Sequence, residues 1–332
     1  MKNILVIGAG AMGAAFTIPC LDNNHKVTLC EPYNYGLVKK ILSKKKFHPN
    51  LKLNLPKKLI VKKFSQEILT KKWDLIAIAV SSIGIDLIRE KLKQLKSNCP
   101  ILVLTKGLKY EKKSKRITTM SEQLNSGNKK LNLSVLKGPC LAKELAKKIN
   151  TSVVIANKNI NIAKSIGKLI STKYYKLEYS NDVRGTEICS AVKNIYSMII
   201  GAGEGLNTSS SIFRKSISEM VYLTKFFKGK EETVYGLAGI GDLYVSALGG
   251  RNSKMGEYLG KGFTYKRAKK KYMPNDTIEG AQLAFNIAPY ILRKINNKKI
   301  PLMASLLKAI YKNISDIHIR KHIFISPWSK QQ

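Results

Sequence analysis

The chain has 332 residues, 44% of them hydrophobic, and a formal net charge of +38. This length suggests about two domains with sizeable cores, and no stretch reaches the roughly 18 apolar residues of a membrane span. The lysines are spread along the whole chain, without aromatic interleaving of the kind that stacks bases, so we expect no specific nucleic acid partner. A positive field would still attract anionic substrates.

The five cysteines are widely spaced, odd in number and without a Cys-x-x-Cys pair: Cys20, Cys30, Cys99, Cys140 and Cys189. This pattern favours neither a zinc site nor a disulfide framework, so we expect no metal. The first apolar stretch is interrupted by glycine after about four residues, which is too short for a signal peptide. We therefore expect a cytoplasmic protein.

An apolar run at residues 4–7 is followed by a glycine-rich turn that contains Gly8, Gly10 and Gly13. Gly8 allows a tight turn, Gly10 lets a pyrophosphate approach the backbone, and Gly13 lets the next helix pack closely. A second strand, 26–30, ends in Glu31, eighteen positions after Gly13. This is about the place of the acid that binds the adenosine ribose, so the pattern predicts dinucleotide binding.

Further along, strands and helices alternate to about residue 180. The expected strands are 59–61, 73–80, 101–104, 133–136, 151–156 and 174–179, with a covering helix at 85–95 and another starting near residue 141. Run 73–80 is apolar apart from Asp74, as in a parallel strand buried on both faces. We therefore predict an α/β fold, a doubly wound, mostly parallel sheet of the Rossmann type, over residues 1–180.

Beyond residue 180 the strand signals stop. Apolar residues recur at helical spacing in 183–198, 211–227, 281–295 and 302–314. The sequence therefore predicts an all-helical substrate and catalytic domain over residues 181–332.

Several side chains in these elements suggest chemistry. Lys106 follows strand 101–104, where it can point into a crevice or be a solvated loop cation. Lys193 lies on an apolar helix, where it can be catalytic or can extend to solvent. A lysine is costly to bury unless it is paired. Asp242, at the end of a glycine-rich stretch, can pair with Lys193 or cap the following helix, and Ser246 lies on the same helical face.

Beyond these residues, Arg251 and Asn252 follow Gly249 and Gly250. A forked guanidinium beside flexible backbone suits a phosphate or carboxylate. Together these motifs resemble the NAD(P)-dependent sn-glycerol-3-phosphate dehydrogenase family, and the resemblance spans almost the full chain. The matching segments, in order, are Gly8 to Gly13, Lys106-Gly107, Gly138-Pro139 with Ala142 and Glu144, Glu187 to Asn194, Gly236 to Asp242, Arg251-Asn252, and Glu279-Gly280.

The resemblance implies a second domain of the 6-phosphogluconate-dehydrogenase type and hydride exchange between NAD(P) and sn-glycerol 3-phosphate or dihydroxyacetone phosphate, which supplies glycerol phosphate for phospholipids. It implies that Lys193 moves the proton, Lys106 polarises the carbonyl and Asp242 orients the base. Substrate contacts would come from Lys106, Gly138, Cys140, Lys193, Asp242, Ser246, Gly250, Arg251 and Asn252. Cofactor contacts would come from Gly8, Gly10, Ala11, Met12, Gly13, Glu31, Lys106, Ala142, Arg251, Ile278 and Glu279.

Some positions depart from the family's pattern. Cys140 and Gly250 replace hydroxyl residues, and Asp242 and Arg251 lie closer together than expected. Another phosphorylated polyol therefore stays open as substrate. Glu31 would repel a 2′-phosphate, which favours NAD(H) slightly over NADP(H).

Three further questions stay open at this stage. One alternative is a ketopantoate-reductase-like enzyme, which shares the opening motif and a catalytic lysine. Another is a basic nucleic-acid-binding protein built on a Rossmann scaffold. The number of subunits is also open, with a homodimer as one arrangement.

Overall fold

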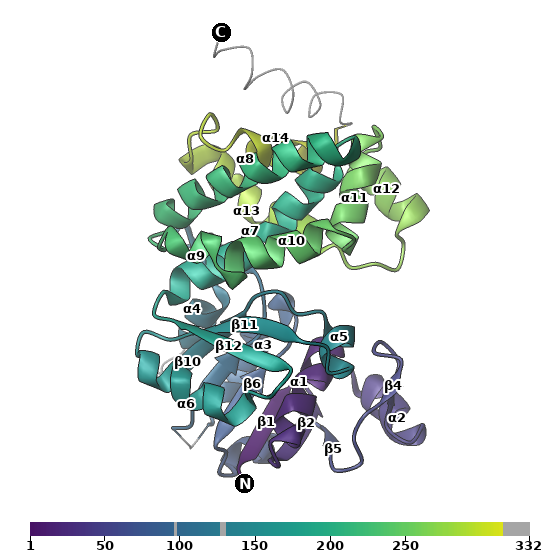
Figure 1. Cartoon of the computed structure of the whole chain (residues 1–332), viewed down its shortest axis with the longest axis vertical. Coiled ribbons are helices and arrows are strands. Elements are labelled where there is room, and N and C mark those ends of the chain that lie inside the picture. Colours follow the sequence, from purple (N-terminus) through teal and green to yellow (C-terminus); the bar gives the residue numbers. More distant parts are fainter. Residues whose placement is uncertain (96–97, 127–130, 315–332) are drawn as a thin grey trace. The chain divides into compact units, whose positions relative to one another are not determined.

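A computed structural model describes residues 1–95, 98–126 and 131–314 (Figure 1). Residues 315–332 of the predicted helical domain lie outside this part. The chain forms two compact units: the first comprises residues 1–106 and 120–183, and the second comprises residues 107–119 and 184–332.

An eight-stranded sheet organises the described part of the first unit. Its strands, in spatial order, are β12 (Tyr175–Ser180), β11 (Thr151–Ala156), β10 (Leu133–Lys137), β7 (Ile101–Val103), β6 (Leu75–Ile78), β1 (Asn3–Ile7), β2 (Lys26–Glu31) and β5 (Ile60–Lys63). Neighbouring strands are parallel except β10 and β11. The predicted mostly parallel sheet is therefore confirmed.

Helices cover both faces of this sheet (Figure 1). One hydrophobic cluster contains Ile4 and Val6 of β1 and includes residues of α1 (Ala11–Asp22), α2 (Tyr35–Ser43), α5 (Ala142–Ala146) and α6 (Ile160–Ile170). The other contains Leu5 and Ile7 and includes residues of η1 (Gln66–Thr70), α3 (Ile85–Leu92) and α4 (Met120–Asn125). Alternate side chains of β1 thus pack into the hydrophobic cores on opposite faces of the sheet, as expected of a strand buried on both faces.

Two short features complete this unit. The 3₁₀ turn η2 (Ser82–Gly84) precedes α3, and strands β3 (Phe47–His48) and β4 (Leu53–Asn54) form a small antiparallel pair after α2. The sequence did not predict β3 and β4, because two-residue strands carry no readable periodicity.

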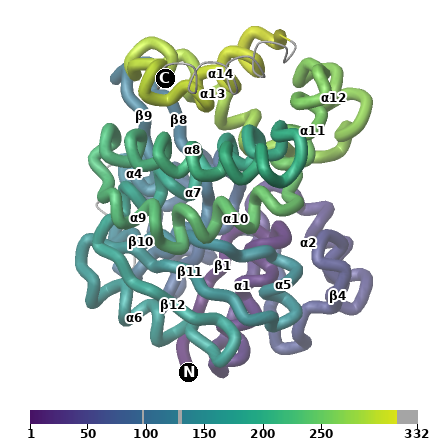
Figure 2. Tube along the Cα trace, turned by 45° about the horizontal axis from the view of Figure 1, so that its top comes forward, coloured from purple at the N-terminus to yellow at the C-terminus, as the bar shows by residue number. Residues whose placement is uncertain are grey.

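The second unit is helical from residue 184 to residue 314. Its helices are α7 (Val183–Gly201), α8 (Gly205–Phe226), α9 (Glu232–Tyr235), α10 (Asp242–Ala247), α11 (Arg251–Gly260), α12 (Tyr265–Tyr272), α13 (Glu279–Lys294) and α14 (Pro301–Lys312), with a π-helical turn, η3 (Leu237–Gly241), before α10. The unit also includes the hairpin β8 (Leu108–Glu111) and β9 (Arg116–Thr119), which packs against α13 (Figure 2). The sequence analysis did not predict this hairpin.

Helix α7 forms the centre of the second unit. Every residue from Gly185 to Ile200 is buried, including the side chains of Glu187 and Lys193. A helix enclosed on all sides has neighbours all around it, so its side chains are held in place by packing. Among the residues that the structure describes, no helix is both long and apolar enough to span a membrane.

A buried carboxylate ties three of these helices together. Glu219 of α8 accepts hydrogen bonds from the backbone N–H groups of Leu302 (2.7 Å) and Met303 (3.0 Å) at the start of α14. The hydroxyl of Tyr196 in α7 donates to the same carboxylate at 3.1 Å. The residue before α14 is Ile300, which has no capping side chain, so Glu219 replaces the local N-cap.

The free energy of unfolding should depend on pH through Glu219. Burial raises its pKa to about 7 from a usual value of 4.5, and the hydrogen bonds it accepts offset only part of this effect. An acid with a raised folded-state pKa contributes stability that is full below about pH 4.5 and is lost as the pH rises through about 7. Relative to Glu219→Gln, the unchanged chain should lose up to about 3 kcal/mol across this range in urea titrations.

Glu232→Gln, at an exposed position of α9, is the matched control and should follow the unchanged chain. A difference between Glu219→Gln and the unchanged chain that stays constant with pH would contradict this prediction.

Candidate functional site

The glycine turn after β1 has the geometry that dinucleotide binding needs. Gly8 has a φ of +110°, and a Cβ there would lie 2.7 Å from the carbonyl oxygen of Ala79. A Cβ on Gly13 would overlap the carbonyl oxygen of Gly8. These two positions therefore require glycine, because α1 packs tightly against the ends of β1 and β6.

Gly10, unlike Gly8 and Gly13, faces open space. A Cβ on Gly10 would meet no atom within 4 Å. Gly10 is the N-cap of α1, and no side chain caps this end and no acidic residue lies in its first turn. Ala11 and Met12 begin the helix and are partly buried. The N-terminus of α1 thus has N–H groups without a side-chain cap and a positive partial charge, features that suit a phosphate group.

Glu31 lies beside this turn and is only 4% exposed. One carboxylate oxygen accepts a hydrogen bond from the Ala9 N–H at 2.8 Å. The other accepts from the N–H groups of Tyr33 and Asn34, both at 3.1 Å. Glu31 therefore organises the turn itself, a role that its position in the sequence did not reveal. Its contact with a ribose and its effect on cofactor preference stay predictions.

Two lysines lie at the carboxyl ends of the adjacent strands β7 and β10. The Lys106 amine donates to the carbonyl oxygen of Gly138 at 3.3 Å. Lys137 is buried and donates to the carbonyl oxygens of Val103 (3.0 Å) and Thr105 (2.7 Å). Lys137 thus holds the segment that carries Lys106. Lys137 was not among the predicted site residues, although its position at the end of a buried strand could have indicated it.

Cys140 and Ala142 lie just beyond β10. Cys140 is half-buried and its thiol interacts with the phenol of Tyr175, a buried residue of β12. Ala142 is the first residue of α5, which packs against α1. Cys20, Cys30, Cys99 and Cys189 are buried.

In the second unit, the structure brings Lys193, Asp242 and Ser246 together. The Lys193 amine donates to Oδ1 of Asp242 at 2.8 Å and to the hydroxyl of Ser246. The Lys193 and Asp242 side chains are 8% and 3% exposed. This buried pairing is the one that the sequence suggested, with Asp242 and Ser246 one turn apart on α10. A buried amine held by a carboxylate and a hydroxyl can move a proton at a fixed position.

The π-helical turn η3 sets the direction of Asp242. Its N–H groups at Gly239 and Gly241 both donate to the carbonyl oxygen of Gly236. Single π turns are rare and occur frequently at functional sites. Here the turn ends directly at Asp242, so the carboxylate begins α10 facing α7.

A second cluster of polar side chains lies around the start of α11. Arg251 lies 3.6 Å from Glu279, and both side chains are about half exposed. The Asn252 amide donates to Asn194 of α7 at 3.1 Å and accepts from the Gly280 N–H at 2.8 Å. Asn252 thus links α7 to α13. Asn194 ends the motif that begins at Glu187, but its role could not be predicted from the sequence.

The N-terminus of α11 carries Arg251 and Asn252. Gly250 is its N-cap, no side chain caps this end, and no acidic residue lies in its first turn. A Cβ on Gly250 would lie 3.0 Å from the carbonyl oxygen of Ser246. Ile278 is buried at the N-cap of α13, directly before Glu279.

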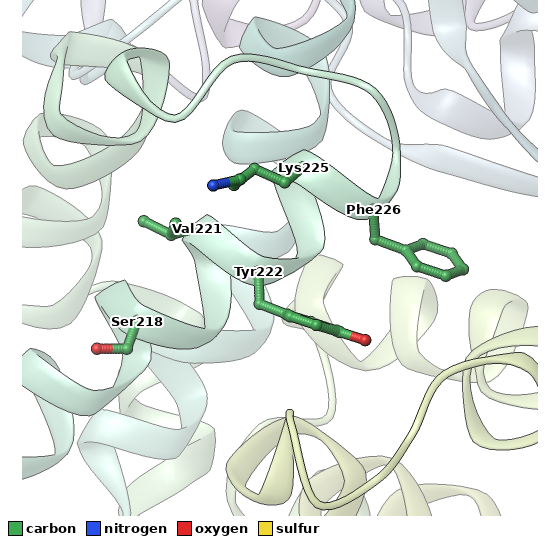
Figure 3. Close-up of a pocket in the computed structure, with 5 residues that line it drawn as sticks. All are labelled: Ser218, Val221, Tyr222, Lys225 and Phe226. Atoms are coloured by element: carbon green, nitrogen blue, oxygen red, sulfur yellow. The ribbon is translucent and has the colours of Figure 1, made fainter.

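The second unit also has a shallow depression of about 360 Å³ on α8, shown in Figure 3. It is lined by Ser218, Val221, Tyr222, Lys225 and Phe226. None of these is a predicted site residue. Across the described ranges, no group of three or more His, Cys, Asp or Glu side chains has the arrangement of a metal site.

Comparison with protein-family models gives two matches. The model described as "NAD-dependent glycerol-3-phosphate dehydrogenase N-terminus" matches residues 3–163, and the corresponding C-terminus model matches residues 182–319.

Among curated proteins, the chain is 27% identical over 323 residues to an NADP(+)-dependent glycerol-3-phosphate dehydrogenase of Archaeoglobus fulgidus, covering 94% of this chain and 96% of that protein. It is 29% identical over 317 residues to a glycerol-3-phosphate dehydrogenase [NAD(P)+] of Phytoplasma australiense, covering 93% of each.

Among solved structures, a glycerol-3-phosphate dehydrogenase of Coxiella burnetii aligns with a TM-score of 0.83 and 25% identity, covering 97% of both chains. A ketopantoate reductase family structure from Ralstonia eutropha aligns with a TM-score of 0.55 and 12% identity, covering 97% of this chain and 98% of that one, which indicates a shared fold alone.

Proposed function

Because this chain belongs to the NAD-dependent glycerol-3-phosphate dehydrogenase family, we propose that Lys193 is the proton-transfer group for interconverting sn-glycerol 3-phosphate and dihydroxyacetone phosphate. The chain is an NAD(P)-dependent oxidoreductase that acts on a CH–OH group, and in this proposal it supplies glycerol phosphate for phospholipid synthesis. The observation that carries the proposal is the buried Lys193 amine, held by Asp242 and Ser246.

Oxidation of a secondary alcohol removes a hydride from carbon and a proton from oxygen. When bound, the dinucleotide accepts this hydride, or supplies it in the reverse direction. The Lys193 amine takes the hydroxyl proton during oxidation and returns it to the ketone oxygen during reduction. Asp242 orients the amine and stabilises its charged form, so no metal is needed.

The remaining residues bind and polarise the substrate. Lys106 donates toward the carbonyl oxygen, and the positive charge favours the electron density that develops there during reduction. Arg251 and the open N-terminus of α11 bind the phosphate group. The Asn252 side chain donates one of its two amide hydrogens to Asn194. In this proposal it donates the other to a phosphate oxygen.

The cofactor would lie along the glycine turn, with its pyrophosphate at Gly10 and the N-terminus of α1. Ala142, Ile278 and Glu279 are further cofactor contacts in this proposal. The charge of Glu31 at the end of β2 favours NADH over NADPH, because a carboxylate repels a 2′-phosphate.

Steady-state rates with purified protein test the substrate and cofactor together. With dihydroxyacetone phosphate, kcat/KM should be higher with NADH than with NADPH by about tenfold. Ketopantoate should be reduced far more slowly, because it lacks the phosphate that Arg251 binds. Faster reduction of ketopantoate, or of another phosphorylated ketone, would replace the proposed substrate.

Removing the proposed base should lower turnover without removing cofactor binding. Lys193→Ala should reduce kcat for dihydroxyacetone phosphate by about 10²–10⁴-fold, while the Kd for NADH stays unchanged. Lys308→Ala, at an exposed position of α14, is the control and should retain full activity. Normal turnover in Lys193→Ala would eliminate this lysine as the base.

A contrasting variant separates phosphate binding from proton transfer. Arg251→Ala should raise the KM for dihydroxyacetone phosphate by about 10- to 100-fold with a smaller change in kcat. Arg267→Ala, also exposed and on α12, should leave KM unchanged. If Arg251→Ala instead lowers kcat alone, Arg251 does not bind the phosphate in the ground state.

A further inference from the structure

A buried histidine contacts the glycine turn from the small β3–β4 pair. His48 is fully buried, and its Nε2 lies 2.9 Å from the carbonyl oxygen of Ala9. The Leu51 N–H donates to Nδ1 of the same ring at 3.2 Å. Because Nδ1 accepts this bond, it carries no proton in the neutral ring. Nε2 therefore carries the proton and donates to Ala9.

Ala9 is thus held on both sides. It lies between Gly8 and Gly10, its N–H donates to the carboxylate of Glu31, and its carbonyl accepts from His48. The neighbouring glycines can adopt many backbone conformations. The hydrogen bonds that Ala9 makes with Glu31 and His48 restrict the backbone of this segment. The two holding residues come from β2 and β3, which are separate segments of the first unit.

We propose that His48 is a positioning residue for the dinucleotide-binding turn, and that dinucleotide affinity falls when its imidazole takes a second proton. The second proton goes to Nδ1, where it faces the Leu51 N–H. Two donors then point at one another, so the ring turns and its bond to Ala9 is lost. A turn that is no longer held in place binds a pyrophosphate less tightly, because ordering it costs free energy at the moment of binding.

Burial is the main influence on the pKa of His48. The charged groups of the neighbouring elements have a smaller effect. From α2, which packs against β3, the charged side chains Lys39 and Lys40 are exposed, and β4 has none. The Lys46 amine donates to the carbonyl oxygens of Lys57 and Leu59. Glu31, at the end of β2, is a charged group beside the turn, and its carboxylate is hydrogen-bonded to the other side of Ala9.

Burial lowers the pKa of His48 from its usual value of 6.5, and its hydrogen bond to Ala9 offsets part of this effect. The neutral ring is therefore fully present above about pH 6.5, and it is lost as the pH falls through the lowered folded-state pKa. Dinucleotide affinity should accordingly be constant in the alkaline range and decrease in acid.

The test compares binding of NAD⁺ by calorimetry between about pH 5.5 and 8, without substrate. For the unchanged chain, the Kd should rise by about 3- to 10-fold toward the acid end. His48→Gln keeps an N–H donor near the position of Nε2 but cannot titrate, so its Kd should be nearly independent of pH. His48→Leu loses the donor and should bind about 3- to 10-fold more weakly even at pH 8.

His25→Gln is the matched control. The His25 ring contacts the Leu169 carbonyl at the opposite end of β2, and its pKa is also lowered, mainly by burial. This variant should keep the pH dependence of the unchanged chain.

The proposal is overturned if His48→Gln keeps that dependence, or if a folded His48→Leu binds NAD⁺ as tightly as the unchanged chain. Circular dichroism reports folding, and if His48→Leu does not fold, His48→Gln alone decides. The test involves only the dinucleotide, so it is independent of the proposed substrate.

Discussion

The buried pair of Lys193 and Asp242 is the constraint on which the second unit depends. Removing an amine and a carboxylate from water costs several kcal/mol for each, and the cost is recovered only with close contact and further hydrogen bonds. Ser246 supplies one of these. The enclosed helix α7 fixes the lysine, and the π turn before α10 fixes the carboxylate. A pair with this geometry is weak evidence for stability but suits controlled proton transfer.

In the first unit the corresponding constraint is the close packing of the glycine turn between β1 and α1, where we propose that backbone groups bind the pyrophosphate. Gly8 and Gly13 are required by close packing, while Gly10 faces open space. Order is supplied by Glu31 and His48, which hold the residue between the first two glycines. Glu31, whose position in the sequence predicts a ribose contact, is a structural support of the turn, so replacing it would change the turn itself.

Long elements could be predicted from the sequence because their periodicity is strong. Strand 73–80 and helix 183–198 correspond to β6 and α7, with differences at the ends. The β8–β9 hairpin could not be predicted, because its short polar strands depend on packing against α13, distant in sequence. The same applies to the site. Motif spacing indicated the pairing of Lys193 with Asp242, whereas Lys137 and His48 act through backbone carbonyls of other segments, which no local pattern encodes.

A double-mutant cycle in kcat for dihydroxyacetone phosphate reduction tests the central claim, that the lysine and its carboxylate act as one unit. It needs Lys193→Ala, Asp242→Asn and the combined variant. The account predicts that the combined variant turns over within about twofold of Lys193→Ala, because Asp242 acts only through the amine. Losses that multiply in the combined variant would show that the two residues act independently and would contradict the account.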